Sequence, residues 1–262
     1  MRFKKRFFKS ALLSLAVAAA FGHLLLAPSG AAAQDKPADD RAAIEQIIRD
    51  YLLNNPEILL EMQNALEKRQ MAMLKAKQLA ALKDNKDKIY NSPNQMTIGD
   101  PEAPITVVEF FDYNCGYCKR ALDDMNRIVS ENADVKFVMK EFPVLGEPSL
   151  EAHRVSLAVI RLYPELYAKF HRDLLSLGGP KNGDVALTTA VKLGADESKL
   201  KEEASRPATD EAIREVYALA DGLGITGTPS YVIGDEVVFG AVGYNHLTPL
   251  VANIRKCGKT VC

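Results

Sequence analysis

Cys115 and Cys118, separated by two residues, are the side chains of this sequence best suited to covalent chemistry. They stand at the start of a helical pattern, where residues three apart lie within one turn, so their sulfurs can close a disulfide without backbone movement. The unsatisfied amide groups and positive dipole end of that helix favour the thiolate of Cys115, which we expect to face solvent. In thiol–disulfide exchange, Cys115 would therefore attack and Cys118, one turn deeper, would resolve the mixed disulfide.

The segments around the cysteines predict how they are positioned. Strands are predicted from apolar and β-branched runs at four places, residues 105–111, 135–142, 230–233 and 237–240. Helical periodicity follows the cysteines, dominates residues 149–216 and returns at residues 246–256. This order predicts an α/β fold, in which a β-α-β unit and a closing hairpin form one sheet and a helical block is inserted between them.

The first 33 residues have the composition of a secretory signal peptide. Residues 2–9 contain five basic side chains and no acid, an apolar run over residues 11–26 follows, and Ala31-Ala32-Ala33 gives a cleavage site expected after Ala33. An uncleaved membrane anchor is the alternative, but Gly22 and His23 interrupt the apolar run, which is short for a bilayer span. We therefore expect export to the periplasm or an equivalent compartment, where disulfides persist.

Cleavage would also change the charge of the chain. Residues 1–33 contain five of the 33 basic residues and none of the 34 acidic ones, so the remaining formal charge is 28 minus 34, or −6. This balance gives no reason to expect nucleic acid as a partner. The remaining residues are numerous enough to bury a sizeable core.

Residues 34–94 are predicted to form a helical arm followed by a linker at 83–94. One apolar stripe of the arm contains Ile44, Ile47, Ile48, Tyr51 and Leu52. Asn54-Asn55-Pro56 breaks this pattern, and Asn55 and Pro56 suit the cap and first residue of a second helix. Because exposed stripes this apolar favour a covering subunit, we expect homo-oligomerisation through residues 40–90. Packing of the arm against its own domain is the alternative.

Over residues 97–256 the chain resembles the DsbA family of exported thiol-disulfide oxidoreductases. The likeness depends on four segments taken together, Glu109-Phe110-Phe111, Cys115-Gly116-Tyr117-Cys118, Glu141-Phe142-Pro143 and Gly227-Thr228-Pro229. The arm resembles the N-terminal region of suppressor-of-copper-sensitivity C (ScsC) members, some of which are trimeric disulfide isomerases. The resemblance implies a thioredoxin-like fold over residues 95–262 with a helical insertion at about 149–216. It also implies an enzyme that isomerises or forms disulfides in protein substrates.

The resemblance assigns roles to residues near the cysteine pair. Pro229 matches the family's cis-proline, and Thr228 before it would pair with a substrate strand. From the residues alone, a trans Pro229 that opens a strand is the better interpretation. Glu109 matches a buried family acid that helps move the proton of the second cysteine, and burial in an apolar strand would raise its pKa. The alternative is a solvent-facing Glu109, with Asp112 in its role.

The two residues between the cysteines, Gly116 and Tyr117, would set access and electrostatics at the sulfur. Gly-Tyr here, like Thr228 before Pro229, resembles the isomerases rather than the powerful oxidase with Pro-His. The expected clients are unfolded or misoxidised secreted proteins. A membrane reductant would keep the pair reduced in an isomerase, whereas a membrane oxidase would keep it oxidised in a pure dithiol oxidase.

Cys257 and Cys262 are predicted to form a small structural disulfide that pins the C-terminal tail, with a second redox pair as the alternative. No cofactor beyond the cysteine pair and no metal site is expected, since no two of His153, His171 and His246 show ligand spacing. A copper-tolerance protein that binds Cu(I) through its thiols is an alternative function. A holdase whose arm clamps clients without chemistry is a weaker one.

Overall fold

The computed structural model describes residues 38–262, so the predicted signal peptide lies outside the described residues. The described chain divides between Leu59 and Leu60 into two compact units. The first unit contains α1 (Ala38–Asn54), and α2 (Ile58–Asp84) begins at its end. Within residues 38–262, no helix combines the length and apolar character needed to cross a bilayer.

The break between α1 and α2 lies where the sequence predicts it, but Asn55 makes different hydrogen bonds from those expected of a cap of α2. The side-chain Nδ2 of Asn55 donates to the carbonyl oxygen of Tyr51 at 2.7 Å, and its backbone N–H donates to the same oxygen at 3.0 Å. Asn55 therefore closes the end of α1 instead of capping α2. The second helix begins at Ile58, two residues after Pro56, which lies in the turn.

The second half of α2 packs on the globular unit. Leu82 is buried, and the Gln78 side chain donates to the carbonyl oxygen of Leu223 at 3.0 Å. The short helix α3 (Lys86–Tyr90) follows, with Ile89 fully buried. The segment 83–94, predicted as a linker, is thus partly helical and contributes to the core.

Five strands form one mixed sheet in the order β1-β3-β2-β4-β5. Their bounds are β1 (Met96–Ile98), β2 (Ile105–Phe111), β3 (Val135–Glu141), β4 (Ser230–Ile233) and β5 (Glu236–Phe239). Strands β2 and β3 are parallel and the other neighbouring pairs are antiparallel. The sequence does not predict β1, because three residues are too few to show an alternating pattern.

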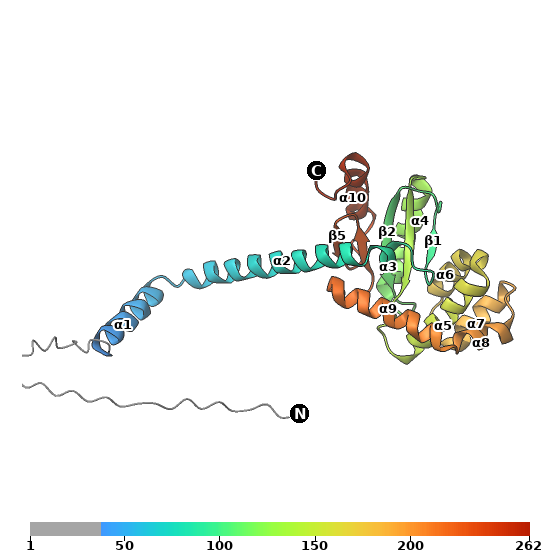
Figure 1. Ribbon diagram of the computed structural model, residues 1–262, viewed down its shortest axis with the longest axis horizontal. Coiled ribbons are helices and arrows are strands. Elements are labelled where there is room, and N and C mark those ends of the chain that lie inside the picture. Colours follow the sequence, from blue (N-terminus) through green and yellow to red (C-terminus); the bar gives the residue numbers. More distant parts are fainter. Residues whose placement is uncertain (1–37) are drawn as a thin grey trace, which may run out of the picture. The chain divides into compact units, whose positions relative to one another are not determined.

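Helices cover both faces of the sheet and form a separate block at one end. Helix α4 (Gly116–Glu131) joins β2 to β3 in the parallel β-α-β unit. The inserted block contains α5 (Glu147–Leu162), the 3₁₀ turn η1 (Pro164–Leu166), α6 (Tyr167–Ser176), α7 (Gly183–Lys192), α8 (Glu197–Ala204) and α9 (Pro207–Leu223). Figure 1 shows α5, α6, α7 and α8 gathered together, beside the strands.

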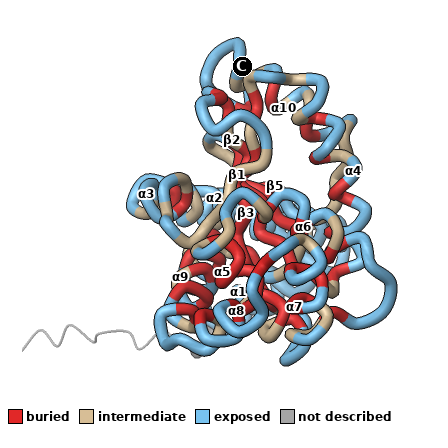
Figure 2. The backbone as a smooth tube through the Cα atoms, turned by 90° about the vertical axis from the view of Figure 1, so that its right-hand side faces the viewer, coloured by how far each residue is buried: buried red, intermediate tan, exposed pale blue. Residues whose placement is uncertain are grey.

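Alternate residues of the central strands point to two different cores. Val107 and Phe111 of β2 pack with α4, with the C-terminal helix α10 (Tyr244–Cys257) and with the inserted helices. Val108 and Phe110 point the other way and pack with α9, α3 and the end of α2. Figure 2 shows the buried stretches along the strands, α5 and α9. Since side chains alternate along a strand, Glu109 lies on the α4 face with Val107 and Phe111.

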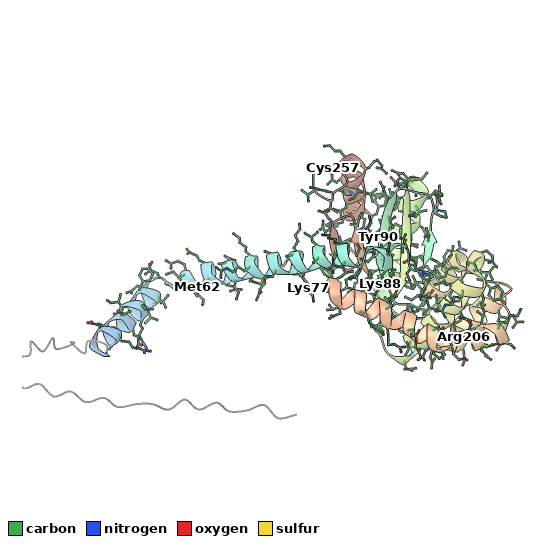
Figure 3. All side chains as sticks on the ribbon, in the orientation of Figure 1. Met62, Lys77, Lys88, Tyr90, Arg206 and Cys257 are labelled. Carbon is green, nitrogen blue, oxygen red and sulfur yellow. A yellow bond between two sulfur atoms is a disulfide. The ribbon has the colours of Figure 1, made fainter. Side chains whose placement is uncertain are left out.

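The C-terminal tail turns back onto the β4–β5 hairpin. The backbone N–H and the hydroxyl of Thr260 both donate to Oδ1 of Asp235 in the hairpin turn, at 3.0 and 2.9 Å. Beside it, Cys257 at the end of α10 is joined to Cys262 by a disulfide (Figure 3). Gly234 in the same turn has φ +55° and lies against Ile254 of α10, so another residue there would be strained and would displace the Ile254 side chain.

Candidate active site

Cys115 is the residue that caps α4, and Cys118 lies one turn further along it. The backbone of Cys115 is extended (φ −79°, ψ 115°), and both sulfurs are reduced. Cys118 is fully buried, and Cys115 is only 7% exposed. This exposure is less than the sequence predicts, because a loop preceding β4 covers the helix tip.

That loop contains Thr228 and Pro229, whose peptide bond is cis. It brings the Thr228 carbonyl oxygen to 3.2 Å from Sγ of Cys115, a contact in which the protonated thiol donates and which the thiolate cannot make as a hydrogen bond. The loop is held on both sides, since Gly240 N–H donates to the Pro229 carbonyl at 2.9 Å and the Ser230 hydroxyl donates to the Gly227 carbonyl at 2.7 Å. A fixed backbone therefore lies directly against the candidate nucleophile.

The surroundings of Cys115 favour its ionised form. Interaction with the Cys118 thiol is the largest cause that lowers the pKa of Cys115, to about 5, with smaller contributions from the Thr228 side chain and from the backbone N–H groups of Cys118 and Tyr117. These N–H groups act from the start of α4 without a cap hydrogen bond to the Cys115 side chain. Burial acts in the opposite direction but does not outweigh these donors. At neutral pH Cys115 is thus a thiolate, the form that attacks disulfides.

Cys118 and Glu109 behave in the opposite way. Burial raises the pKa of Cys118 far above its ordinary value, and the hydrogen bond to Cys115 and the charge of Glu109 add to this effect. Burial also raises the pKa of Glu109 to about 8, with a smaller contribution from the Cys115 thiolate. Glu109 is 3% exposed, which rules out the solvent-facing alternative. The site thus pairs one ionised thiol with a neutral thiol and a neutral carboxyl group.

The two residues between the cysteines differ in their surroundings. Space for a side chain is open at Gly116, where an added Cβ would meet nothing within 4 Å. Tyr117 is 59% exposed, and the Arg120 guanidinium lies 4.2 Å from the centre of its ring. The Tyr117 side chain therefore offers an exposed aromatic surface, backed by a cation, two residues after Cys115 in the chain.

A family model described as the DSBA-like thioredoxin domain matches residues 106–251, more than half of the chain. The chain belongs to the DsbA family. A second model, described as the N-terminal domain of the copper resistance protein ScsC, matches residues 40–72. Both ranges agree with the predicted fold and with the resemblance of the arm.

Solved structures and a curated relative support this assignment. A thioredoxin-like oxidoreductase from Silicibacter pomeroyi DSS-3 has 38% identity and a TM-score of 0.63, with 66% of this chain and 99% of that chain covered. A linker-deletion variant of ScsC from Proteus mirabilis has 28% identity and a TM-score of 0.64, with coverages of 84% and 97%. Disulfide bond formation protein D of Bacillus subtilis is 26% identical over 167 residues, 58% of this chain and 73% of that protein. The chain is therefore a DsbA-like thiol–disulfide oxidoreductase with an ScsC-type N-terminal domain.

Asp112 has a different task in this DsbA-family site from the one that the sequence left open. Its carboxylate accepts hydrogen bonds from the backbone N–H groups of Asn114, Val144 and Leu145 at 2.7 to 3.0 Å, and from the Ser149 hydroxyl at 2.7 Å. With four donors satisfied in a buried position, Asp112 fixes loops and is not a substitute for Glu109 in proton transfer.

Asn114, which no pattern in the sequence marks, attaches the active-site loop to the inserted helices. Its side chain donates to the Lys181 carbonyl at 2.8 Å and accepts from the Lys181 N–H at 2.7 Å. On the next turn, Lys119 of α4 donates to the carbonyl of Leu177. These contacts join segments 58 to 67 residues apart in the sequence, so no local pattern could have revealed them.

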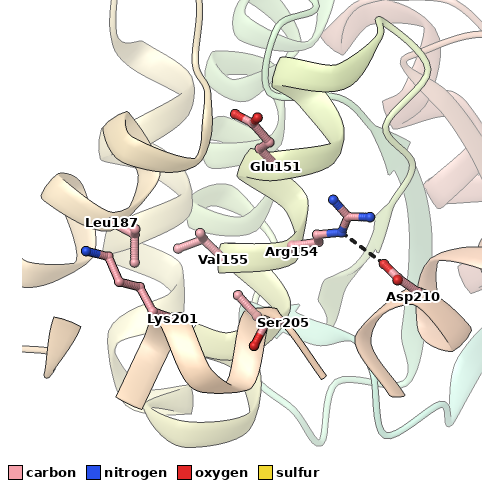
Figure 4. A pocket seen from close by; sticks show the side chains of 8 residues that line it. Glu151, Arg154, Val155, Leu187, Lys201, Ser205 and Asp210 are labelled. Atoms are coloured by element: carbon pink, nitrogen blue, oxygen red, sulfur yellow. Dashed lines mark hydrogen bonds and ion pairs between the residues drawn. The ribbon is translucent and has the colours of Figure 1, made fainter. Parts of the chain in front are cut away.

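Metal ligands do not gather in the part of the chain that the structure describes. No group of three or more His, Cys, Asp or Glu side chains there converges to hold an ion. A separate pocket of about 410 Å³ lies among the inserted helices (Figure 4). Arg154 on its wall is paired with Asp210 at 2.9 Å, so its charge is already neutralised.

Proposed function

We propose that this oxidoreductase isomerises disulfides in exported protein clients, and forms them when its cysteine pair is oxidised. The observation that carries the proposal is a Cys115 thiol with a pKa of about 5, placed 3.2 Å from the Thr228 carbonyl beside cis Pro229. An extended client segment can pair with the backbone of such a loop, which brings its disulfide to the sulfur.

The proposed reaction begins when the Cys115 thiolate attacks one sulfur of a client disulfide. A bond forms between Cys115 and the client, and the second client sulfur leaves as a thiolate. In isomerisation, that thiolate attacks another client disulfide, and a client thiolate finally releases Cys115. If this fails, Cys118 attacks Sγ of Cys115, and its proton passes to water or to the minority of Glu109 that is ionised at neutral pH. The reduced client leaves while the Cys115–Cys118 disulfide forms.

The balance between isomerase and oxidase depends on how strongly the thiolate is stabilised. Nucleophilic thiols of related enzymes have pKa values from about 3.5 in the strongest oxidant to about 7 in a reductant. A pKa of about 5 for Cys115 lies between them, and its donors do not include the exposed Tyr117 hydroxyl. This intermediate value supports an isomerase that a membrane thiol reductant keeps reduced, rather than a pure oxidase served by a membrane oxidase.

Two measurements on the same preparation test the proposal. The reduction potential is determined against glutathione, and reactivation of a scrambled disulfide-rich protein is followed with Cys115→Ser and Cys118→Ser as controls. We expect an intermediate potential and isomerase activity that Cys115→Ser abolishes. A strongly oxidising potential without reactivation would reject the isomerase in favour of the oxidase. Full activity of Cys115→Ser would instead support the holdase.

We also propose that the arm assembles subunits. Over residues 44–62, nine large apolar side chains are 44% to 72% exposed and only Ile58 is partly buried; the nine are Ile44, Ile47, Ile48, Tyr51, Leu52, Leu53, Leu59, Leu60 and Met62. Figure 3 shows Met62 on the stretch of α2 whose side chains stand free of the domain. An apolar surface of this kind is unfavourable in water unless a partner covers it, and the match to an ScsC N-terminal domain is consistent with a second copy.

Point variants test assembly through the arm better than a shortened protein that starts at Asn94. Such a protein would lack the side chains of Leu82 and Ile89, which are buried in the globular unit. Ile47→Asp combined with Met62→Asp places charges in the apolar surface, and Arg49→Asp on the same helix is the matched control. Light scattering should show a smaller particle for the double variant only, together with lower isomerase activity. An unchanged mass would contradict assembly through the arm.

Export to the periplasm, with cleavage after Ala33, remains part of the proposal. Mass spectrometry of protein recovered from that compartment should find a mature chain that begins at Gln34. A chain that retains Met1 would contradict cleavage. The disulfide between Cys257 and Cys262 is consistent with an oxidising compartment.

Cu(I) binding is the second candidate function, because the N-terminal match is to a copper resistance protein domain. The Cys115 and Cys118 thiols are soft ligands that suit this ion. If the protein binds copper as part of its function, titration of the reduced protein with Cu(I) in the presence of a competing chelator should show stoichiometric binding. Binding that survives Cys115→Ser would show that these thiols are not its site.

A further inference from the structure

A group of buried polar side chains lies directly behind the loop that precedes Cys115. We call it the Tyr113 cluster, and its members are Tyr113, Glu141, His153, Ser156, Tyr167 and His171. Each of them is at most 1% exposed. They come from the active-site loop, from the end of β3 and from helices α5 and α6, so the cluster joins the thioredoxin-like part to the inserted block.

The Glu141 carboxylate is the acceptor at the centre of the cluster. Its Oε1 accepts from the Ser156 hydroxyl at 2.7 Å and from the Tyr167 hydroxyl at 3.0 Å, and its Oε2 lies 2.5 Å from Nδ1 of His153. Three partners compensate for burial of the carboxylate, which makes this a satisfied network rather than an unpaired charge.

One contact leads from this network to the active-site loop. The backbone N–H of Tyr113 donates to Nε2 of His153 at 3.3 Å, so Nε2 carries no proton. The proton of a neutral ring then lies on Nδ1, which donates to Glu141. Glu141 therefore selects the tautomer of His153 that can hold the loop, as a carboxylate does for a catalytic or metal-binding imidazole.

We propose that His153 is a positioning residue for Cys115, a role that rests on the proposed function of Cys115 as nucleophile. The His153 side chain of α5 holds this loop by accepting a hydrogen bond from the backbone N–H of Tyr113. The Tyr113 hydroxyl is additionally bonded to the Ser156 hydroxyl at 2.9 Å. Two residues later, the Cys115 N–H closes the turn by donating to the Asp112 carbonyl at 3.0 Å.

Loss of the His153 acceptor would change the surroundings of Sγ of Cys115 through this turn. A buried N–H without a partner is unfavourable, so the loop would shift towards water or another acceptor. The turn leads directly into the N-terminal end of α4, whose backbone N–H groups favour the Cys115 thiolate, so a shift of the turn would move Sγ relative to that end. We expect the midpoint of Cys115 ionisation to rise by about one pH unit, which corresponds to about tenfold less thiolate at pH 4.

The test is the pH dependence of Cys115 alkylation by iodoacetamide, with the modified peptide identified by mass spectrometry. His153→Leu removes the acceptor, and His153→Gln retains an amide that can accept from Tyr113 and donate to Glu141. Tyr113→Phe removes the hydroxyl but leaves the backbone contact. Leu200→Ala, at a buried position of the otherwise mostly exposed α8, lowers stability without removing a hydrogen bond of the cluster and controls for general destabilisation.

With each rate divided by the rate of the same variant at pH 8, where the thiol is fully ionised, we expect His153→Leu to react about tenfold more slowly than wild type at pH 4. This division removes the difference in intrinsic nucleophilicity between thiolates of different pKa. His153→Gln, Tyr113→Phe and Leu200→Ala should keep the wild-type midpoint even where their thermal stability falls. If His153→Leu does not fold, His153→Ala replaces it in the comparison. A midpoint of Cys115 ionisation that is raised equally in His153→Gln and His153→Ala would contradict the proposal. A raised midpoint in His153→Ala together with a wild-type midpoint in His153→Gln would support it.

Alkylation of the wild-type protein distinguishes failure of the proposed function from failure of the role given to His153. If wild-type Cys115 reacts no faster than free cysteine at any pH, the proposed function fails. If wild-type Cys115 reacts rapidly and His153→Leu has the same pH profile, only the role of His153 is wrong.

Discussion

Replacement of Glu109 by glutamine should make the reduced protein more stable at mildly alkaline pH. Burial raises the pKa of Glu109 from 4.5 to about 8. The folded state therefore keeps its proton where the unfolded state has lost it. Stability linked to Glu109 is fully present below pH 4.5, falls as pH rises and is lost above about pH 8.

The size of the effect follows from this difference in pKa. About 3.5 pH units correspond to about 5 kcal/mol at 1.36 kcal/mol per unit, and Glu109 is too deeply buried for solvent to screen much of it. Relaxation around the ionised carboxylate lowers this upper bound, so we expect Glu109→Gln to gain about 3 to 5 kcal/mol at pH 8. In the disulfide form the gain should be smaller, because the Cys115 thiolate that contributes to the shift is gone.

Urea unfolding of reduced wild type and Glu109→Gln at pH 4.5, 6 and 8 measures this difference. Glu102→Gln, at an exposed position on the loop before β2, is the matched control and should follow wild type at each pH. Equal stabilities of Glu109→Gln and wild type at pH 8 would refute a buried, protonated Glu109. At pH 8, where about half of Glu109 is ionised, the same substitution should slow release of a mixed disulfide by Cys118 by at least about tenfold, because the carboxylate that accepts the Cys118 proton is lost.

Three further outcomes are expected. Cys118→Ser should accumulate a mixed disulfide between Cys115 and a client, seen as a band that reductant removes; absence of any adduct would contradict attack by Cys115. Joint replacement of Cys257 and Cys262 by serine should lower the unfolding free energy by about 2 kcal/mol, the chain-entropy value for so short a loop, with exchange activity unchanged; a loss of activity would indicate a second redox pair. Asp112→Asn should cost about 2 to 4 kcal/mol in urea unfolding, because an amide N–H2 then faces backbone donors; a neutral result would show that the loops are held by other contacts.

The inserted helices are part of the active site rather than a separate accessory. The Tyr113 cluster, the Asp112 carboxylate and the Asn114–Lys181 pair each join the loop before Cys115 to the inserted block or to the segment leading into it. Because these bonds lie within a buried, satisfied network, the loop cannot move freely against α5. The orientation of Cys115 is thus set from two sides, by this network and by the Thr228 loop.

Local sequence alone determined the elements that carry the chemistry. β-Branched and aromatic residues at 105–111 specify β2, and the spacing of Cys115 and Cys118 places both sulfurs in one helical turn. Such features depend on neighbours within a few residues, and they can be recognised before any fold is known. The predicted apolar stripe of the arm is likewise a property of helical periodicity, and α1 has the predicted end at Asn54.

Only the tertiary structure decided which polar groups meet. It placed Glu109 in the α4 core rather than in solvent, covered Cys115 with the Thr228 loop, and gave Asp112 a structural task. It also brought His153 and Glu141 behind Tyr113, although the three are up to 40 residues apart. A carboxylate or imidazole has the same local pattern whether it is buried or exposed. Its pKa and its partners depend on the desolvation and hydrogen bonds that distant segments supply.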